Sequence, residues 1–134
     1  MNKNSRIVFV CEHGAAKSVI AAAYFNKIAR EIGLSERAIA RGTNPDSELS
    51  EKAVTGLMED GLTSSESTPQ KLSSEDLGIA KQVITFCKLP ENYQHEKAIE
   101  YWDDVPPVSE DYERARDAIL MHIKKLINFS SPVT

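Results

Sequence analysis

Residues 6–20, RIVFVCEHGAAKSVI, run from an apolar stretch through a short loop into a helical pattern. Residues 7–11 are apolar and mostly β-branched or aromatic, which predicts a buried strand. Residues 12–17 are small or polar, and a helical pattern follows from Ser18. The stretch therefore predicts a strand, a tight loop and a helix, with Cys11 at one end of the loop and Lys17 at the other.

The loop between this strand and helix is a predicted anion site. A helix that begins here points its unpaired backbone N–H groups and the positive end of its dipole into the loop, which favours a bound oxyanion. The same positive end favours the ionised form of a thiol. Cys11 is therefore expected to share one electropositive loop with an anionic ligand.

The composition indicates a single domain that spans residues 1–134. A chain of 134 residues with 41% hydrophobic content can bury one real core and leaves no room for a second domain. It contains no run of 18 apolar residues and no signal-peptide pattern, so we expect a cytoplasmic protein without membrane contact. A net charge of −4 without Lys or Arg clusters argues against a nucleic-acid partner.

Helical and strand patterns alternate along the rest of the chain. Helices are predicted over 18–32, from an N-cap at Ser50 to Gly61, around 74–77 and from Ser109 onward, and strands over 37–41, 82–87 and 98–102. This order predicts an α/β fold with a small, mostly parallel sheet of about four strands and helices on both faces. Cys11 and Cys87 both end strands, where such sheets bind ligands, so we expect them to lie close together.

Residues 11–18, CEHGAAKS, resemble the phosphate-binding loop of the low-molecular-weight protein tyrosine phosphatases, whose pattern is Cys, five residues, Arg, then Ser or Thr. The similarity extends over nearly the whole chain toward the thioredoxin-coupled arsenate reductases, which are built on the same fold. The shared segments are 83–87, VITFC, the Tyr101-Trp102 pair before an acidic loop with prolines, and 112–117, YERARD. The resemblance implies a low-molecular-weight phosphatase-like fold and a reaction that needs no cofactor.

The resemblance also implies a phosphatase that acts on phosphotyrosine or other aryl phosphate esters through a phosphocysteine intermediate. Cys11 would be the nucleophile, Ser18 would donate its hydroxyl to the thiolate, and Lys17 would neutralise the anion. Phosphate, sulfate and arsenate are the expected oxyanion ligands, and a phosphoprotein is a candidate substrate. The oxygens of the anion would be held by the backbone amides of Glu12, His13, Gly14, Ala15, Ala16 and Lys17.

The loop departs from the family pattern at three positions. Lys17 replaces an arginine whose planar fork binds two oxygens at once, so the anion site is expected to survive while transition-state geometry suffers. Gly14 replaces an asparagine that braces the loop, and it supplies backbone freedom without the brace. His13 adds an imidazole that faces either the anion or the solvent. A slow enzyme, a shifted substrate and a relative that only binds phosphate or phosphopeptides all stay open.

The general acid of the family is an aspartate in an Asp-Pro loop, and here the corresponding segment reads WDDVPP over 102–107. A strict count from Trp102 places Pro106 at the acid position. A two-residue deletion after Trp102 places Asp104 there instead. We therefore predict Asp104 as the general acid, with Asp103 as its rival.

Cys87 separates two kinds of enzyme. In the arsenate reductases a cysteine at this strand end attacks the arsenylated nucleophile, and a third cysteine passes the disulfide to the surface. This chain has only two cysteines, so a Cys11–Cys87 disulfide would be reduced by a small thiol or would protect the nucleophile from over-oxidation. Phosphatase is the first interpretation because it needs only the loop, and arsenate reduction is the second. With His13 the cysteines make three scattered soft-metal ligands without a fourth, so no metal site is expected.

Several of these residues also have a purely structural explanation. A cysteine that ends a hydrophobic strand is usually a small core residue, which is the alternative for Cys11. Asp103 and Asp104 also fit a solvated turn. His95 and His122 are expected to be surface residues or satisfied core histidines.

Overall fold

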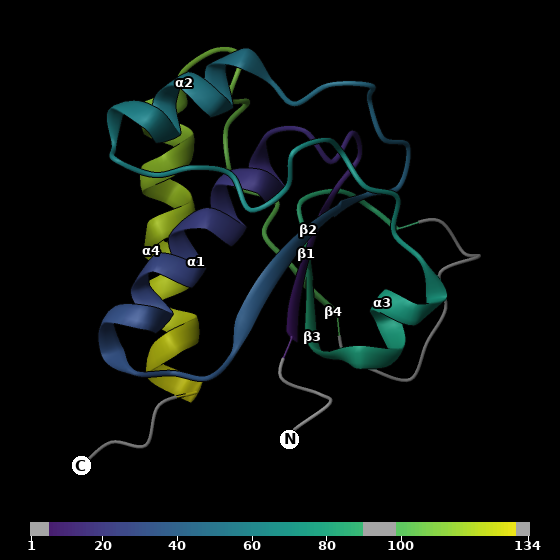
Figure 1. The fold of residues 1–134 in the computed structure, drawn as a ribbon, viewed down its shortest axis with the longest axis vertical. Helices are drawn as coiled ribbons and strands as arrows, with labels where there is room; N and C mark the ends of the chain where they lie inside the picture. Colours follow the sequence, from purple (N-terminus) through teal and green to yellow (C-terminus); the bar gives the residue numbers. More distant parts are fainter. Residues whose placement is uncertain (1–5, 90–98, 131–134) are drawn as a thin grey trace.

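The computed structural model describes residues 6–89 and 99–130. Four strands form a parallel sheet in the order β2-β1-β3-β4, and helices lie on both of its faces (Figure 1). The predicted α/β fold is thereby confirmed. The elements in chain order are β1 (Arg6–Cys11), α1 (Lys17–Ile32), β2 (Arg37–Gly42), α2 (Glu51–Glu59), α3 (Ser74–Ile79), β3 (Ala80–Thr85), β4 (Ile99–Tyr101) and α4 (Tyr112–Ser130).

The central strand β1 is buried on both faces of the sheet, as a strand in a parallel sheet must be. Successive side chains of a strand point to opposite faces, so Phe9 and Cys11 join the core shared with α1, α2 and α4. Val8 and Val10 point the other way and pack in the smaller core that includes Leu77 of α3. The Cys11 side chain therefore lies on the face of the sheet that α1, α2 and α4 cover.

Helix α1 is fixed to the edge strand β2 by a buried side chain. Asn26 donates to the carbonyl of Ala38 at 3.1 Å and accepts from its N–H at 2.7 Å, as a neighbouring strand would. The helix ends at Gly33, whose φ of 81° allows the left-handed cap that the sequence predicted. It begins at Lys17, one residue before the predicted start.

Helix α4 begins at Tyr112, so the predicted start at Ser109 was wrong. The carbonyl of Pro107 accepts from the N–H groups of Glu110 and Asp111, which closes a turn ahead of the helix. Asp111 then caps the helix by accepting from the N–H of Arg114 at 3.1 Å. Although α4 has 19 residues, neither it nor any other described helix is long and apolar enough to cross a membrane.

Strand β3 ends at Thr85, two residues before the predicted end at Cys87. The hydroxyl of Thr85 donates to the carbonyl of Cys87 at 2.7 Å and accepts from its N–H at 3.1 Å. These local bonds turn the chain and compete with continued strand pairing. The strand predicted over 98–102 is present as the three residues of β4, and His95 lies outside the described residues.

Three helices meet at the carboxylate of Asp60, the residue that ends α2. Tyr24 of α1 and Tyr112 of α4 both donate their hydroxyls to this carboxylate, and Arg116 of α4 donates at 3.2 Å. Burial opposes the ionisation of Asp60, but the three donors outweigh it and hold its pKa below the ordinary value. Burial and the bond to Asp60 raise the pKa of Tyr24 to about 12.

Candidate active site

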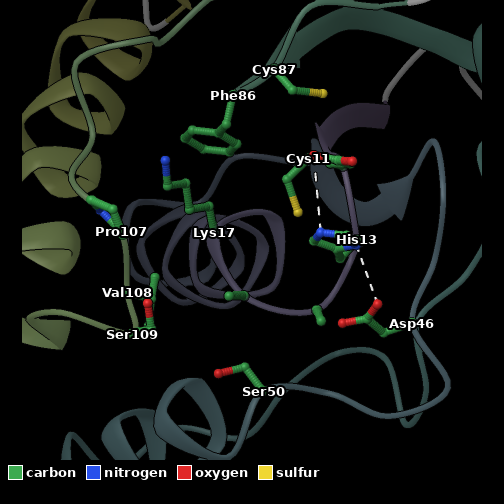
Figure 2. A pocket seen from close by; sticks show the side chains of 13 residues that line it. Cys11, His13, Lys17, Asp46, Ser50, Phe86, Cys87, Pro107, Val108 and Ser109 are labelled. Atoms are coloured by element: carbon green, nitrogen blue, oxygen red, sulfur yellow. Dashed lines mark ion pairs between the residues drawn. The ribbon is translucent and has the colours of Figure 1, made fainter.

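A pocket of about 370 Å³ opens at the carboxyl ends of β1 and β3 (Figure 2). Cys11 and Cys87 both line it, which confirms the prediction that the two cysteines lie close together. Figure 2 shows Asp46 and residues 107–109 on opposite sides of the loop that follows β1. The lining residues are Cys11, Glu12, His13, Ala15, Ala16, Lys17, Asp46, Ser50, Phe86, Cys87, Pro107, Val108 and Ser109.

The backbone of loop 11–17 turns its carbonyl groups toward the segment that follows β2. A trans peptide points its C=O and N–H in opposite directions, so the amides that follow these carbonyls point to the inner side of the loop. Within the described part of the chain, no backbone N–H of residues 12–17 donates to a protein acceptor. The inner amides are thus available to an anion. The outward bonds run from Thr43, Asn44, Asp46 and Ser50 to the carbonyls of Cys11, Glu12, His13 and Ala15, at 3.2, 2.7, 3.0 and 2.9 Å.

The sulfur of Cys11 lies 3.0 Å from the hydroxyl oxygen of Ser18. Ser18 is fully buried at the start of α1, and Cys11 is 8% exposed at the base of the pocket. A hydroxyl in this position can donate to a thiolate and hold it ionised. The pair that the resemblance implied is therefore present in the structure.

Two glycines allow loop 11–17 to pack against the end of β2. Gly14 has a φ of +61°, which side chains rarely tolerate, so glycine supplies the backbone freedom expected of it. Gly42 pairs with Cys11 in the sheet, and a Cβ on Gly42 would lie 2.6 Å from the Gly14 nitrogen. The strand predicted over 37–41 stopped one residue short of Gly42, although the place of this glycine at the end of that strand was a usable signal.

Lys17 lines the pocket, and its ammonium group also binds the backbone of the segment between β4 and α4. The Nζ atom donates to the carbonyl of Val105 at 2.9 Å. This bond joins the first residue of α1 to the segment between β4 and α4. Lysine thereby brings one positive charge to the pocket and positions the segment that borders it.

Neither Asp103 nor Asp104 is among the residues that line the pocket, so the general acid predicted there stays a prediction. The Asp104 carboxylate lies 2.7 Å from Nε2 of His122, and this hydrogen bond holds the pKa of Asp104 below its ordinary value. His122 in turn stacks on the buried Trp102, with ring centroids 4.6 Å apart. The hydrogen bond to His122 holds the Asp104 side chain against α4. The position of Asp104 therefore does not support the general-acid role predicted for it.

His13 lines the pocket between two carboxylates (Figure 2). Its Nδ1 lies 3.2 Å from Oδ1 of Asp46, and its Nε2 lies 3.9 Å from Oε1 of Glu12. Asp46 was missed by sequence reasoning. The available signal was its place in the polar segment after β2, since ligands of parallel sheets bind beyond the strand ends.

Cys87 is a free thiol on the same pocket as the free thiol Cys11. Burial raises the pKa of Cys87, and the nearby Cys11 and Glu12 raise it further, against the opposing hydrogen bond from Thr85. The thiol form of Cys87 is therefore favoured at neutral pH. Within residues 6–89 and 99–130, no three His, Cys, Asp or Glu side chains are grouped as metal ligands.

Comparison with known proteins connects this site to one family. The sequence model of the family "Low molecular weight phosphotyrosine protein phosphatase" matches residues 6–127. An arsenate reductase from Archaeoglobus fulgidus is 27% identical, with a TM-score of 0.77 over 91% of this chain and 98% of that one. A low molecular weight protein tyrosine phosphatase from T. tengcongensis is 22% identical, with a TM-score of 0.71 over 93% and 99%.

A third solved structure shares the fold at lower identity. SP-PTP, a low molecular weight protein tyrosine phosphatase from Streptococcus pyogenes, is 14% identical, with a TM-score of 0.81 over 96% of this chain and 94% of that one. No curated protein sequence matches this chain significantly. Solved structures of the same fold thus carry the names of both reaction types.

Proposed function

Because the chain belongs to the low molecular weight phosphotyrosine protein phosphatase family, we propose that it hydrolyses aryl phosphate monoesters, phosphotyrosine among them. The observation that supports this most is the 3.0 Å contact between the Cys11 sulfur and the Ser18 hydroxyl at the base of the pocket. The outward carbonyls of loop 11–17 add support, because they leave the inner amides available to phosphate oxygens.

The proposed reaction has two displacements at phosphorus. The Cys11 thiolate attacks phosphorus, a sulfur–phosphorus bond forms, and the bond to the aryl oxygen breaks as that oxygen takes a proton. Water then attacks the phosphocysteine, the sulfur–phosphorus bond breaks, and phosphate and the thiolate are released. The amides of residues 12–17 hold the non-bridging oxygens throughout, and Ser18 stabilises the thiolate before attack and after release.

Lys17 is proposed to make this a slow enzyme. Its ammonium group uses one of its three N–H donors on Val105, and it lacks the planar fork with which a guanidinium binds two equatorial oxygens at once. The charge that it contributes supports binding of the anion more than it supports the geometry of the transition state. The Lys17→Arg variant is therefore expected to turn over faster, by roughly tenfold for one added charge-assisted hydrogen bond.

The test is hydrolysis of p-nitrophenyl phosphate and of a phosphotyrosine peptide by the purified protein. We expect Cys11→Ser to lower kcat by about 10⁴-fold or more, because the covalent route is lost. Cys87→Ser is the matched control, since the phosphatase reaction does not use this second sulfur. Equal turnover by the wild type and Cys11→Ser would contradict the proposal. Phosphate binding without any turnover would identify a relative that only binds its ligand.

Reduction of arsenate is a second candidate, and the specific observation that favours it is Cys87 on the same pocket as Cys11. The Cys11 thiolate would displace hydroxide from arsenate to form a sulfur–arsenic bond. Cys87 would then attack the Cys11 sulfur, so that the sulfur–arsenic bond breaks, its electron pair reduces arsenic(V) to arsenite, and a disulfide forms. An external thiol would reduce the disulfide, because the chain contains only these two cysteines.

A further inference from the structure

The hydrolysis proposed above needs a proton donor, because an aryl oxide is a poor leaving group unless its oxygen is protonated. The segment between β4 and α4 gives the pocket only Pro107, Val108 and Ser109. Asp104 of that segment is paired with His122 instead. Among the described residues, the candidate donors are therefore the titratable side chains that line the pocket, which are Cys11, Glu12, His13, Lys17, Asp46 and Cys87.

His13 is the member of this set that fits the task best. The ammonium group of Lys17 already donates to Val105, and Cys11 is the nucleophile. The side chains of Glu12 and Asp46 are 63% and 55% exposed, and exposed carboxylates are acceptors rather than donors at neutral pH. Histidine alone among ordinary side chains changes its charge between about pH 5 and 8, so it can both give and take a proton there.

Asp46 holds His13 in one orientation through two contacts. Its carboxylate lies 3.2 Å from Nδ1 of His13, and its backbone N–H donates to the His13 carbonyl at 3.0 Å. A carboxylate only accepts, so this ion-pair contact favours the ring form that carries a hydrogen on Nδ1. Nε2 is then the ring atom left to exchange a proton with a bound molecule, which is the arrangement of a base oriented by a carboxylate.

The charges around His13 also suit a proton donor. A carboxylate faces each ring nitrogen, with Glu12 Oε1 3.9 Å from Nε2 and Asp46 Oδ1 3.2 Å from Nδ1. Lys17 is the positive group on this pocket, and Cys11 and Cys87 are its remaining titratable groups. His13 is half-exposed, so protons can also exchange between its ring and the solvent.

We infer that His13 is the general acid of the proposed reaction and that Asp46 is its positioning residue. The proton on Nε2 passes to the aryl oxygen as the phosphorus–oxygen bond breaks, which leaves a neutral imidazole. The same nitrogen then takes a proton from the water that attacks the phosphocysteine, so the imidazolium is restored at the end of the cycle. This inference rests on the proposed phosphatase activity and replaces the aspartate predicted from the sequence.

The kinetic test compares leaving groups. Phenyl phosphate needs a proton on its departing oxygen, whereas 2,4-dinitrophenyl phosphate does not. We expect His13→Gln to lower kcat/KM for phenyl phosphate by about 100-fold while the dinitrophenyl ester changes by less than about threefold. We also expect the His13→Gln variant to lose the alkaline limb of the wild-type pH profile.

Asp46 is tested by the Asp46→Asn variant. Its matched control is Glu48→Gln, which removes another exposed carboxylate from the same segment after β2.

Asp46→Asn is expected to lower the phenyl phosphate rate by about tenfold and to shift the alkaline limb of the profile, and Asp46→Glu to restore part of it. A change that only damaged the loop would slow both esters equally and leave the limb in place. An equal fall for both esters in His13→Gln, or loss of the alkaline limb in Asp104→Asn instead, would overturn the assignment.

A binding measurement separates this inference from the proposed function. NMR titration of the histidine rings is followed with and without inorganic phosphate, and His122 serves as the internal reference. We expect phosphate to raise the measured pKa of His13 by more than about half a pH unit and to leave His122 unchanged. If no ester is hydrolysed but His13 responds, the phosphatase proposal fails and the contact of His13 with the anion stands. If His13 does not respond, the inference fails whatever the turnover.

Discussion

At the scale of single residues, the contact between Gly14 and Gly42 decides whether the anion loop can form. We expect Gly42→Ala to lower the free energy of unfolding by about 2 kcal/mol or more. The added Cβ would lie 2.6 Å from the Gly14 backbone nitrogen, so the backbone of loop 11–17 would have to shift. Urea unfolding followed by circular dichroism measures the change. Phosphate affinity should fall with it, since the displaced loop carries the inner amides.

Gly33→Ala is the matched control for this prediction. Gly33 has a φ of +81° but no atom within 4 Å of an added Cβ, so its substitution meets only the cost of a left-handed backbone. That cost is about 1 kcal/mol. If Gly42→Ala is no more destabilising than Gly33→Ala, the close packing of loop 11–17 on β2 is not needed for stability.

The site residues that the sequence predicted lie close together in one short stretch of the chain. Cys11, Lys17 and Ser18 stand within residues 11–18, and the resemblance of this stretch to the family pattern implied the contact between the sulfur and the Ser18 hydroxyl. Asp46 reaches the pocket from a segment after another strand, so its place in the sequence indicates a strand end but its contact with His13 is seen only in the structure. The pairing of Asp104 with His122 of α4 likewise cannot be predicted from its neighbours in the sequence.

At the scale of elements, the carboxylate of Asp60 joins α1, α2 and α4. We expect Asp60→Asn to lower the free energy of unfolding at pH 7 by about 2 kcal/mol, because two partly buried hydroxyls and Arg116 lose a charged acceptor. The pKa of Asp60 is lowered on folding, so its contribution is full above the ordinary aspartate value of about 4 and is lost as the pH falls through the lower folded value.

The measurement is urea unfolding of both proteins between pH 7 and pH 2. The difference between the wild type and Asp60→Asn should shrink toward the acid end. Asp117→Asn is the matched control, since Asp117 also binds Arg116 but its side chain is 66% exposed. An exposed pair of this kind contributes little, so its loss should change stability by less than about 0.5 kcal/mol at any pH. Equal effects of the two variants would count against the three-helix junction.

The elements that the sequence predicted well carry their own boundary signals. Ser50 caps α2 by accepting from Ala53, and Gly33 ends α1, as the sequence pattern predicted. The boundaries that were wrong depend on competition between local hydrogen bonds. Thr85 turns the chain before Cys87, and the carbonyl of Pro107 closes a turn ahead of α4. Hydrophobic periodicity predicts neither turn, because both turns arise from hydrogen bonds of polar groups at the ends of the elements.

At the scale of the whole molecule, the pocket gathers one segment from beyond each of the four parallel strands. Loop 11–17 follows β1, the segment with Asp46 follows β2, Cys87 follows β3, and residues 107–109 lie after β4. Parallel strands bring their carboxyl ends to one edge of the sheet, so sequence order was enough to predict that the cysteines meet. It could not predict which side chains of the two outer segments turn inward, since that depends on partners such as His122.

The arsenate candidate requires a disulfide between Cys11 at the end of β1 and Cys87 beyond β3, which line the same pocket. We expect arsenate to convert both thiols into an intramolecular disulfide in the wild type but not in Cys87→Ser. Burial raises the pKa of Cys87, so the thiolate that attacks becomes more abundant as the pH rises, and disulfide formation should accelerate from pH 7 to pH 9.

The bond would close a large loop of the chain, so it should also change the stability of the whole domain. Closing such a loop restricts the unfolded state and is worth up to about 4 kcal/mol, which should raise the Tm of the oxidised protein over that of the reduced one. Thiol counting and non-reducing mass spectrometry measure disulfide formation and its dependence on pH, and thermal unfolding measures the change in Tm. Sulfate in place of arsenate is the control, because it is an oxyanion of similar shape that is not reduced by thiols under these conditions. A disulfide that forms equally with sulfate would show that Cys87 protects Cys11 from oxidation, and the arsenate candidate would then fall.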